Sequence, residues 1–240
     1  MEQEATSGRS AIITGGSKGI GKAIASAFAG EGFTILICSR SEQHLADASA
    51  DLRNRHPAAV IKTFAADFSK KEEVLAFGEW CLQQGTPEIL VNNAGIYLPG
   101  NLSEEDEGNM EQIMNINFFS AYHLTRQLLP FMKEQGKGHI FNIGSIAGLM
   151  AYEGGGSYSV SKFALNGFSI NLRHELKRAG IKVTTVFPGA VMTDSWAGFD
   201  NSNNRIMEAT DIAAMILAAS KLSPQATVEE IVIRPQLGDL

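Results

Sequence analysis

The segment SAIITGGSKGIGKAIASAFAG, residues 10–30, decides the fold class of this 240-residue chain. It starts with an apolar, β-branched run, passes through a glycine-rich turn at 15–21 and ends in a helical pattern. Glycines let the backbone approach a pyrophosphate, and the free N–H groups at a helix start favour negative charge. The spacing reads G-x-x-x-G-x-G rather than G-x-G-x-x-G. In this strand–turn–helix context it still predicts a nucleotide-binding turn, with contacts from Gly15, Ser17, Lys18, Gly19, Ile20 and Gly21.

Apolar runs and helical patterns alternate along the rest of the chain. We expect strands at 10–14, 34–38, 60–65, 88–91, 139–143, 182–187 and 230–233, and helices near 18–30, 41–55, 70–84, 106–134, 158–179 and 209–221. Several runs are apolar on both faces, as buried parallel strands require. The pattern predicts an α/β, Rossmann-like, doubly wound parallel sheet of about seven strands. One domain is expected over 10–240, after a polar tail at 1–9, with substrate-side loops at about 146–157 and 190–208.

Composition narrows the class of protein. The net charge of −6 argues against a nucleic-acid partner, which needs clustered Lys and Arg. Residues 1–10 lack the apolar run of a secretory signal, and no stretch approaches the ~20 apolar residues that span a bilayer. Cys38 and Cys81 are too few for a disulfide scaffold or a zinc site, so we expect them to pack in the core. We expect a cytoplasmic protein without a metal or a membrane partner.

The end of the second predicted strand indicates which cofactor binds. An acidic residue normally contacts the ribose hydroxyls of NAD at this place, about 20 residues after the glycine turn. The chain instead reads Cys38-Ser39-Arg40-Ser41. A guanidinium attracts a 2′-phosphate through charge-assisted hydrogen bonds. Arg40, helped by Lys18, therefore favours NADP(H), unless Arg40 is an ordinary loop arginine.

Tyr158 and Lys162 are four residues apart in a helical pattern, so both lie on one helix face. A nearby ammonium lowers the pKa of a tyrosine, and such a tyrosine can act as general acid or base at the oxygen of a C–O bond. Ser145 could hydrogen-bond to that same oxygen. The Tyr–Lys pair alone arises easily by chance, so its meaning depends on the other motifs.

Six motifs occur together in one order. They are TGGSKGIG (14–21), NNAG (92–95), INF (116–118), IGS (143–145), YSVSK (158–162) and PGAVMT (188–193). With them the chain resembles the short-chain dehydrogenase/reductase family over residues ~10 to 195. The resemblance implies that Ser145 orients the substrate oxygen and that Tyr158 is the acid/base. It further implies that Lys162 lowers the pKa of Tyr158 and holds the nicotinamide ribose. Asn117, rather than nearby Asn115, would keep a water that relays protons.

The resemblance also assigns the remaining cofactor contacts. Asp67, followed by Phe68, would contact the adenine, and Asn93, Ala94 and Gly95 would line the adenosine side. Further contacts would come from Ser39, Ile143, Pro188, Gly189, Val191 and Thr193, with the Val191 backbone on the carboxamide. Other readings stay open: Asp67 or Thr193 could merely cap a helix. His123 is expected to be packed or exposed rather than catalytic.

The residues expected to shape a substrate pocket are apolar or aromatic. They are Leu149, Met150, Tyr152, Met192, Trp196 and Phe199, and half of them could equally be lid or core residues. The segment PGAVMTDSW and the tail VEEIVIRPQLGDL are similar to sepiapterin-reductase-like members of the family. Trp196 would then pack on a pterin or another planar carbonyl compound.

We therefore expect an NADPH-dependent oxidoreductase that reduces a carbonyl group. A 3-oxoacyl-carrier-protein reductase is the alternative. Against it, residues 190–205 show no evident basic face for an acidic carrier, and Arg205 is isolated. A non-catalytic NADP-binding sensor is the alternative of another class. In this family, helices corresponding to 106–134 and 158–179 commonly form a dimer interface, so a homodimer or homotetramer is expected.

Overall fold

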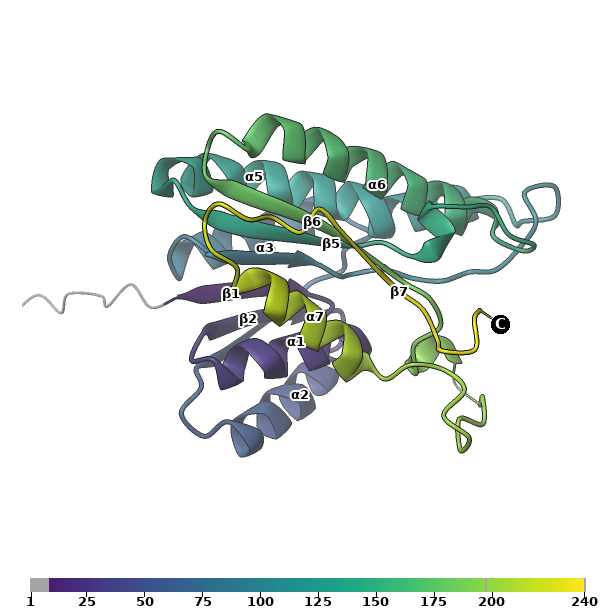
Figure 1. Cartoon of the computed structure of the whole chain (residues 1–240), viewed down its shortest axis with the longest axis horizontal. Helices are drawn as coiled ribbons and strands as arrows, with labels where there is room; N and C mark the ends of the chain where they lie inside the picture. Colours follow the sequence, from purple (N-terminus) through teal and green to yellow (C-terminus); the bar gives the residue numbers. More distant parts are fainter. Residues whose placement is uncertain (1–8, 197, 240) are drawn as a thin grey trace, which may run out of the picture.

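The predicted strands form one parallel sheet in the computed structural model, which describes residues 9–196 and 198–239 (Figure 1). Within these residues the strand order is β3-β2-β1-β4-β5-β6-β7. The strands are β1 (Ser10–Thr14), β2 (Thr34–Ser39), β3 (Ile61–Ala65), β4 (Ile89–Asn92), β5 (Gly138–Ile143), β6 (Ile181–Pro188) and β7 (Glu230–Ile233). The seven predicted strands are thus confirmed, with bounds that shift by no more than one residue. The predicted tail at 1–9 lies outside the described residues except for Arg9.

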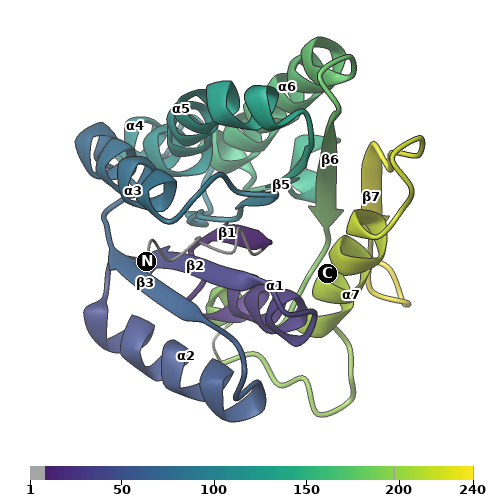
Figure 2. The same ribbon diagram turned by 90° about the vertical axis from the view of Figure 1, so that its left-hand side faces the viewer.

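Helices cover both faces of the sheet. Figure 2 shows α1 (Gly19–Gly30), α2 (Glu42–Arg55) and α7 (Ala209–Ser220) on one face, and α3 (Lys71–Gln83), α5 (Ser120–Gln135) and α6 (Gly156–Leu176) on the other. Successive strand residues point to opposite faces, so Ala11 and Ile13 join the core under α1 while Ile12 joins the core under α3 and α5. Cys38 and Cys81 are buried in this second core. The doubly wound Rossmann-like fold is confirmed.

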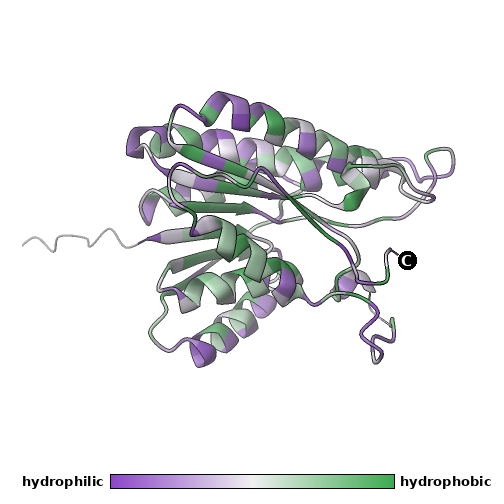
Figure 3. Ribbon diagram, in the orientation of Figure 1, coloured by the Kyte–Doolittle hydropathy of each residue, from purple (hydrophilic) through white to green (hydrophobic). Residues whose placement is uncertain are grey.

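Hydropathy follows this layering. In Figure 3 the strands between the two helix layers are mostly hydrophobic, and hydrophilic residues gather on the outer helix surfaces and loops. Phe28, Phe141 and Phe187 are fully buried, and they fill the space between sheet and helices. Within the described part of the chain, no helix combines the length and the apolar character needed to cross a bilayer.

The helix predicted near 106–134 is confirmed over 109–135, but it is not α-helical throughout. The structure has α4 (Asn109–Met114), a π-helical turn (Asn115–Phe119) and then α5. Gly108, with φ of 90°, takes a left-handed conformation just before α4, so the helix starts three residues late. The π turn carries Asn117, whose amide group hydrogen-bonds to the backbone of Ile96. Such turns are frequent at functional sites.

Candidate active site

A cavity of about 610 Å³ opens at the carboxyl ends of β1, β2, β3 and β4. The strand order reverses here, between β1 and β4, which is where open α/β sheets bind ligands. Nine of the predicted cofactor residues line it: Gly15, Ser17, Lys18, Ser39, Arg40, Asp67, Phe68, Ala94 and Gly95. The sheet therefore brings the glycine turn, the end of the second strand and the NNAG motif to one crevice.

Sequence reasoning missed several residues of the cavity wall. They are Cys38, Ser41, His44, Ala66, Ile96, Ile116 and Asp194. A signal existed for two of them, because Ser41 caps α2 by accepting the His44 N–H at 3.2 Å. Serine is a favoured N-cap residue, so Ser41 could have been recognised in the sequence as the cap of the following helix. That assignment would have placed the first turn of α2 at the crevice. Asp194 carries no such signal, because only the folding of segment 190–208 brings it there.

The glycine turn is held against the end of β4. Gly15 and Gly19 have φ of 64° and 50°. The Thr14 hydroxyl oxygen accepts the N–H groups of Asn93 at 2.9 Å and Ala94 at 2.8 Å. The Asn93 side chain donates to the Thr14 carbonyl at 2.8 Å, so it ties the two strand ends together while Ala94 and Gly95 form the cavity wall. A Cβ at Gly15 would lie 3.2 Å from the Ala94 Cα, so the turn leaves little room for a side chain.

Two cations stand at this crevice. Arg40 is exposed, and Lys18 pairs with Asp194, the Nζ–Oδ2 distance being 3.1 Å. Asp67 faces the same space. Burial raises the pKa of this carboxyl, but hydrogen bonds from Ser69 and the charges of Arg40 and Lys70 outweigh it, so the pKa is lowered overall. Asp67 accepts the Ser69 N–H at 3.0 Å and does not cap α3, which begins at Lys71 after Lys70.

A second group of side chains gathers beside the first turns of α6. Ser145 follows β5 and caps a short 3₁₀ helix (Ile146–Gly148) by accepting the Ala147 N–H at 3.1 Å. Tyr158 and Lys162 lie one turn apart on α6. The Lys162 ammonium donates to the Ile143 carbonyl at 2.9 Å. Only 5% of Lys162 is exposed, and this burial lowers its pKa to about 8.

Asn117 joins this group through the backbone of Ile96. Its Oδ1 accepts the Ile96 N–H at 2.8 Å, and its Nδ2 donates to the Ile96 carbonyl at 3.0 Å and to the Ser161 hydroxyl at 3.1 Å. A Cβ at Gly95 would lie 3.3 Å from Oδ1 of Asn117 and 3.7 Å from Nζ of Lys162. The glycine therefore lets the NNAG segment approach both side chains.

Asn115 is placed elsewhere. It lines a separate hollow of about 290 Å³ together with Phe119 and His123. His123 packs face to face on Phe119, with 6.2 Å between ring centroids, and burial and nearby cations lower its pKa. The π turn thus separates Asn117, which faces Lys162, from Asn115, which does not contribute to the group around Tyr158.

The structure does not show the lowering of the Tyr158 pKa by Lys162 that the resemblance implies. Burial raises the pKa of the half-buried Tyr158, hydrogen bonding with Ser145 acts in the opposite direction, and Tyr97 adds to the rise. Lys162 is not among the causes of this shift; its ammonium donates to the Ile143 carbonyl and lies 5.6 Å from the Tyr158 ring centroid. The i, i+4 spacing predicted the shared helix face correctly, but it could not reveal that the ammonium is turned toward the sheet.

The aromatic neighbour of Tyr158 is Tyr97, which sequence reasoning missed. The two rings meet edge to face, with 4.9 Å between centroids. Tyr152, an expected substrate residue, hydrogen-bonds to Tyr97, and burial together with this bond raises the pKa of Tyr152. Tyr97 lies two residues after the NNAG motif, so its place at the end of β4 was the available signal.

The other expected substrate residues, all within the described part of the chain, are not among those that line the cavity of about 610 Å³. Leu149 and Met150 are exposed, and the Met150 sulfur contacts the Arg234 guanidinium. Trp196 and Phe199 pack edge to face on each other, with 5.3 Å between centroids. The Met192 N–H donates to Met207, which closes the base of the loop at 193–206. Within that loop, Ala197 lies outside the described residues.

The remaining expected cofactor residues surround the two groups. Ile143 ends β5, Pro188 ends β6, and Val191 pairs with Met207 in a β-bridge. Gly21 is buried and Ile20 packs on the core under α1. A Cβ at Gly19 would meet the Thr193 methyl at 3.1 Å, so Thr193 lies over the glycine turn. The Gly189 N–H donates to Ile233.

Arg205 contacts the C-terminal segment. It donates to the carbonyls of Gly238 and Asp239, at 3.0 Å each, and so fixes the C-terminal segment beside residues 190–208. That segment could not be placed from the sequence, because backbone carbonyls carry no sequence signal.

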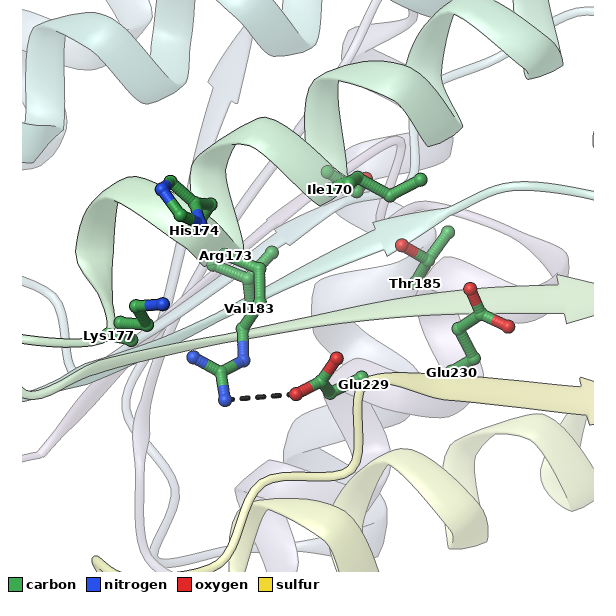
Figure 4. Close-up of a pocket in the computed structure, with 9 residues that line it drawn as sticks. Ile170, Arg173, His174, Lys177, Val183, Thr185, Glu229 and Glu230 are labelled. Carbon is green, nitrogen blue, oxygen red and sulfur yellow. Dashed lines mark ion pairs between the residues drawn. The ribbon is translucent and has the colours of Figure 1, made fainter.

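A smaller cavity, of about 280 Å³, lies between the later turns of α6 and strands β6 and β7 (Figure 4). An ion pair between Arg173 and Glu229, at 3.0 Å, crosses its floor in Figure 4. His174, Lys177 and Glu230 also line it. None of the predicted site residues does, since Tyr158 and Lys162 lie at the other end of α6.

Comparisons with known proteins agree with this geometry. The family model for short chain dehydrogenase matches residues 9–204. Sepiapterin reductase of Chlorobaculum tepidum is 33% identical over 238 residues, which cover 95% of this chain and 97% of that protein. An uncharacterized oxidoreductase of Staphylococcus saprophyticus is 32% identical over 226 residues, covering 94% and 96%.

Solved structures are similar over nearly the whole chain. A metagenomic short-chain oxidoreductase in complex with NADP is 28% identical, with a TM-score of 0.84 over 96% of this chain and 98% of that one. An alcohol dehydrogenase of the archaeon Thermococcus sibiricus, complexed with 5-hydroxy-NADP, is 25% identical, with a TM-score of 0.86 over 95% and 97%. The family model, the full-length relatives and the fold agree, and the chain belongs to the short-chain dehydrogenase family of oxidoreductases.

Proposed function

We propose that this protein is an NADPH-dependent reductase that converts a carbonyl group to an alcohol. The observation that carries the proposal is that the cofactor cavity adjoins the group of side chains around Tyr158. Gly95 lines the large cavity, and a Cβ at this position would lie 3.3 Å from Oδ1 of Asn117 and 3.7 Å from Nζ of Lys162, which is one turn from Tyr158 on α6. A dinucleotide held in the cavity would therefore present its nicotinamide end to the group around Tyr158.

The residues present fit NADP. In the turn from Gly15 to Gly19 three of the five residues are glycines, and a Cβ at Gly15 or Gly19 would approach neighbouring residues to within about 3.1 Å. Arg40 stands at the end of β2 with its guanidinium exposed, where an acidic residue would repel a 2′-phosphate. The NADP and 5-hydroxy-NADP complexes of two structural relatives support the same choice.

The protein's own residues supply positioning and proton transfer. When bound, NADPH supplies the hydride that the carbonyl carbon accepts. Ser145 donates a hydrogen bond to the carbonyl oxygen, and Tyr158 delivers its proton to that oxygen. A raised pKa suits this direction, since it keeps the Tyr158 phenol protonated at neutral pH. Lys162 holds the nicotinamide ribose, and Asn117 keeps the water that links Lys162 to solvent.

For the substrate we propose a planar carbonyl compound, such as a pterin side-chain ketone or a vicinal dicarbonyl. Tyr97 and Tyr152 border Tyr158 and provide aromatic surface with phenolic hydroxyls. The full-length similarity to the Chlorobaculum tepidum sepiapterin reductase supports this class. The loops at 146–157 and 190–208 would form the remaining walls.

We further propose that the enzyme is a homodimer or homotetramer assembled through α5 and α6. Large apolar side chains stay exposed on these two helices, on α4 and on the π turn: Met110, Phe119, Phe131, Val160, Phe163 and Ile170. Light scattering after size exclusion tests this, with Phe163→Glu as the disrupting variant. A monomeric wild type would contradict it.

The function is tested by initial rates of NADPH oxidation against sepiapterin, butane-2,3-dione and an acetoacetyl thioester. Activity on the first two supports reduction of planar or vicinal carbonyls. Activity on the thioester alone would transfer the assignment to 3-oxoacyl reduction. Tight NADPH binding with no turnover of any probe would contradict the proposed substrate class.

A further inference from the structure

The segment between β4 and α4 lies beside the segment that precedes α6 (Figure 1). It runs from Asn93 to Gly108 and includes the cofactor-cavity residues Ala94 and Gly95. The Gly100 N–H donates to the Gly154 carbonyl at 3.0 Å, so the two segments are joined through their backbones. The start of the helix that carries Tyr158 and Lys162 is therefore built against residues about 50 positions earlier in the chain.

One carboxylate makes a second contact between these two segments. Glu105 accepts the backbone N–H of Ser157 at 2.7 Å through Oε1, and it accepts the Ser157 hydroxyl through Oε2. Ser157 is the second residue of α6, and only 1% of it is exposed. Its N–H is one of the groups that a helix leaves without an intrahelical partner. The N-cap residue of α6 is Gly155, which has no side chain to accept this N–H. Glu105 therefore caps α6 from a distant segment.

The local backbone is shaped for this contact. Gly156 has φ of 40°, a left-handed conformation that glycine tolerates best. A Cβ at Gly156 would overlap the Glu105 carboxylate and the Gly100 carbonyl. A carboxylate at a helix N-terminus is also favoured by the helix dipole. Glycine at 156 and glutamate at 105 thus depend on each other.

The contacts on both sides of the first turn of α6 lie next to Tyr158. Ser157 precedes it directly, and Tyr97, which belongs to the same segment as Glu105, packs edge to face on its ring. On the opposite side, the Ser159 hydroxyl donates to Ala147 at 2.6 Å, next to the Ser145 turn. The first turn of α6 is therefore fixed between the Glu105 segment and the Ser145 segment.

We propose that Glu105 is a positioning residue for the proposed reductase. By capping α6 at Ser157 it holds the Tyr158 hydroxyl in register with Ser145 and the Tyr97 ring, without touching the reacting atoms itself. This proposal rests on the proposed function, because it assigns Tyr158 the role of proton donor.

The test compares Glu105→Ala and Glu105→Gln with a matched control, Glu107→Ala, which removes an exposed carboxylate from the same segment. The first readout needs no substrate. Amide hydrogen exchange over residues 155–161 is expected to be about tenfold faster in Glu105→Ala than in the control, because the Ser157 N–H loses its acceptor. Equal exchange in the two variants would overturn the capping contact, whatever the enzyme reduces.

The second readout is kinetic and uses butane-2,3-dione with NADPH deuterated at C4. Glu105→Ala is expected to lose about 10- to 100-fold in kcat, as misplacement of a reacting group does, while the Kd of NADPH changes less than about twofold. The deuterium isotope effect on kcat should rise, since hydride transfer becomes slower than product release. Glu105→Gln retains an acceptor for Ser157 and should recover at least tenfold of the loss. A kcat of Glu105→Ala within twofold of the control would overturn the positioning role.

A third readout separates this proposal from the proposed function. If the wild type reduces none of the probes, the function fails, and the ionisation of Tyr158 decides the positioning role. Ultraviolet titration of each variant against its Tyr158→Phe counterpart reports the pKa of Tyr158. Burial raises this pKa in the folded protein, so release of the first turn should lower it toward about 10 in Glu105→Ala. An unchanged value would overturn the proposal.

Discussion

The two halves of the carboxyl edge of the sheet differ in how they hold their polar groups. The cofactor half, at the ends of β1, β2 and β3, presents a glycine-rich turn and the exposed cations Lys18, which is part of that turn, and Arg40. The catalytic half, at the ends of β4 and β5 and the start of α6, buries Asn117 and Lys162 among backbone carbonyls and side-chain hydroxyls. The two cations of the cofactor half thus stay near water, whereas Asn117 and Lys162 in the catalytic half are desolvated.

This difference shows where burial of a charged side chain costs free energy. Burial lowers the pKa of Lys162 to about 8 and raises that of Tyr158, whereas Arg40 meets solvent. Desolvation penalises the charged form of each buried group. Substitutions in the catalytic half should therefore change rate and stability together, and those in the cofactor half should change affinity alone.

The largest effect is expected from Tyr158→Phe. It removes the proton donor but keeps the ring that packs on Tyr97, so kcat should fall by about 10³-fold, within the range of general acid catalysis. The Kd of NADPH, measured by fluorescence titration, should stay within about twofold. Retained turnover would contradict the assignment of Tyr158.

Lys162→Met should change rate and stability in opposite directions. The rate should fall by about 10²-fold, while the free energy of unfolding at pH 7 should rise by up to about 3 kcal/mol, because a pKa lowered from 10.5 to about 8 is a cost of burying the charge. This cost is complete below pH 8 and shrinks as the folded protein loses the proton between pH 8 and 10.5. Urea unfolding should therefore show a gain at pH 7 that is largely lost at pH 10. A free energy of unfolding at pH 7 that is lower in Lys162→Met than in the wild type would show that Lys162 stabilises the fold.

Arg40→Ser should weaken NADPH binding by about tenfold and leave NADH binding unchanged, because one charge-assisted hydrogen bond to the 2′-phosphate is lost. The exposed Arg55, at the far end of α2, gives the control Arg55→Ser. Isothermal titration with both dinucleotides measures the preference. If both dinucleotides weaken equally, Arg40 contacts a part that they share.

The smallest effect concerns Asp194→Asn. This change frees Lys18 from an exposed ion pair, so NADPH should bind up to about fivefold more tightly, the limit that a surface ion pair of about 1 kcal/mol sets. Asp200→Asn, in the same loop, is the control. Weaker binding of NADPH to Asp194→Asn would show that Asp194 itself contributes to the cofactor site.

The same comparison explains what the sequence could predict. Strand bounds follow from β-branched apolar runs, and the cofactor half follows from glycines at a strand end, so Gly15, Arg40 and Ala94 could be placed in one crevice. In the catalytic half, the spacing of Tyr158 and Lys162 predicted their shared helix face but not the direction of the ammonium. The π turn at Asn117 and the cap that Glu105 provides depend on contacts between distant segments. Periodicity within one segment contains no record of such contacts.

The central claim is that both halves form one site for hydride and proton delivery to a carbonyl group. Mass spectrometry of the product formed from butane-2,3-dione and NADPH that carries deuterium at both hydrogen positions of C4 tests it most directly. We predict one deuterium on the carbinol carbon of the alcohol in the wild type and no product above background in Tyr158→Phe. Consumption of NADPH without deuterium in the alcohol would contradict the claim.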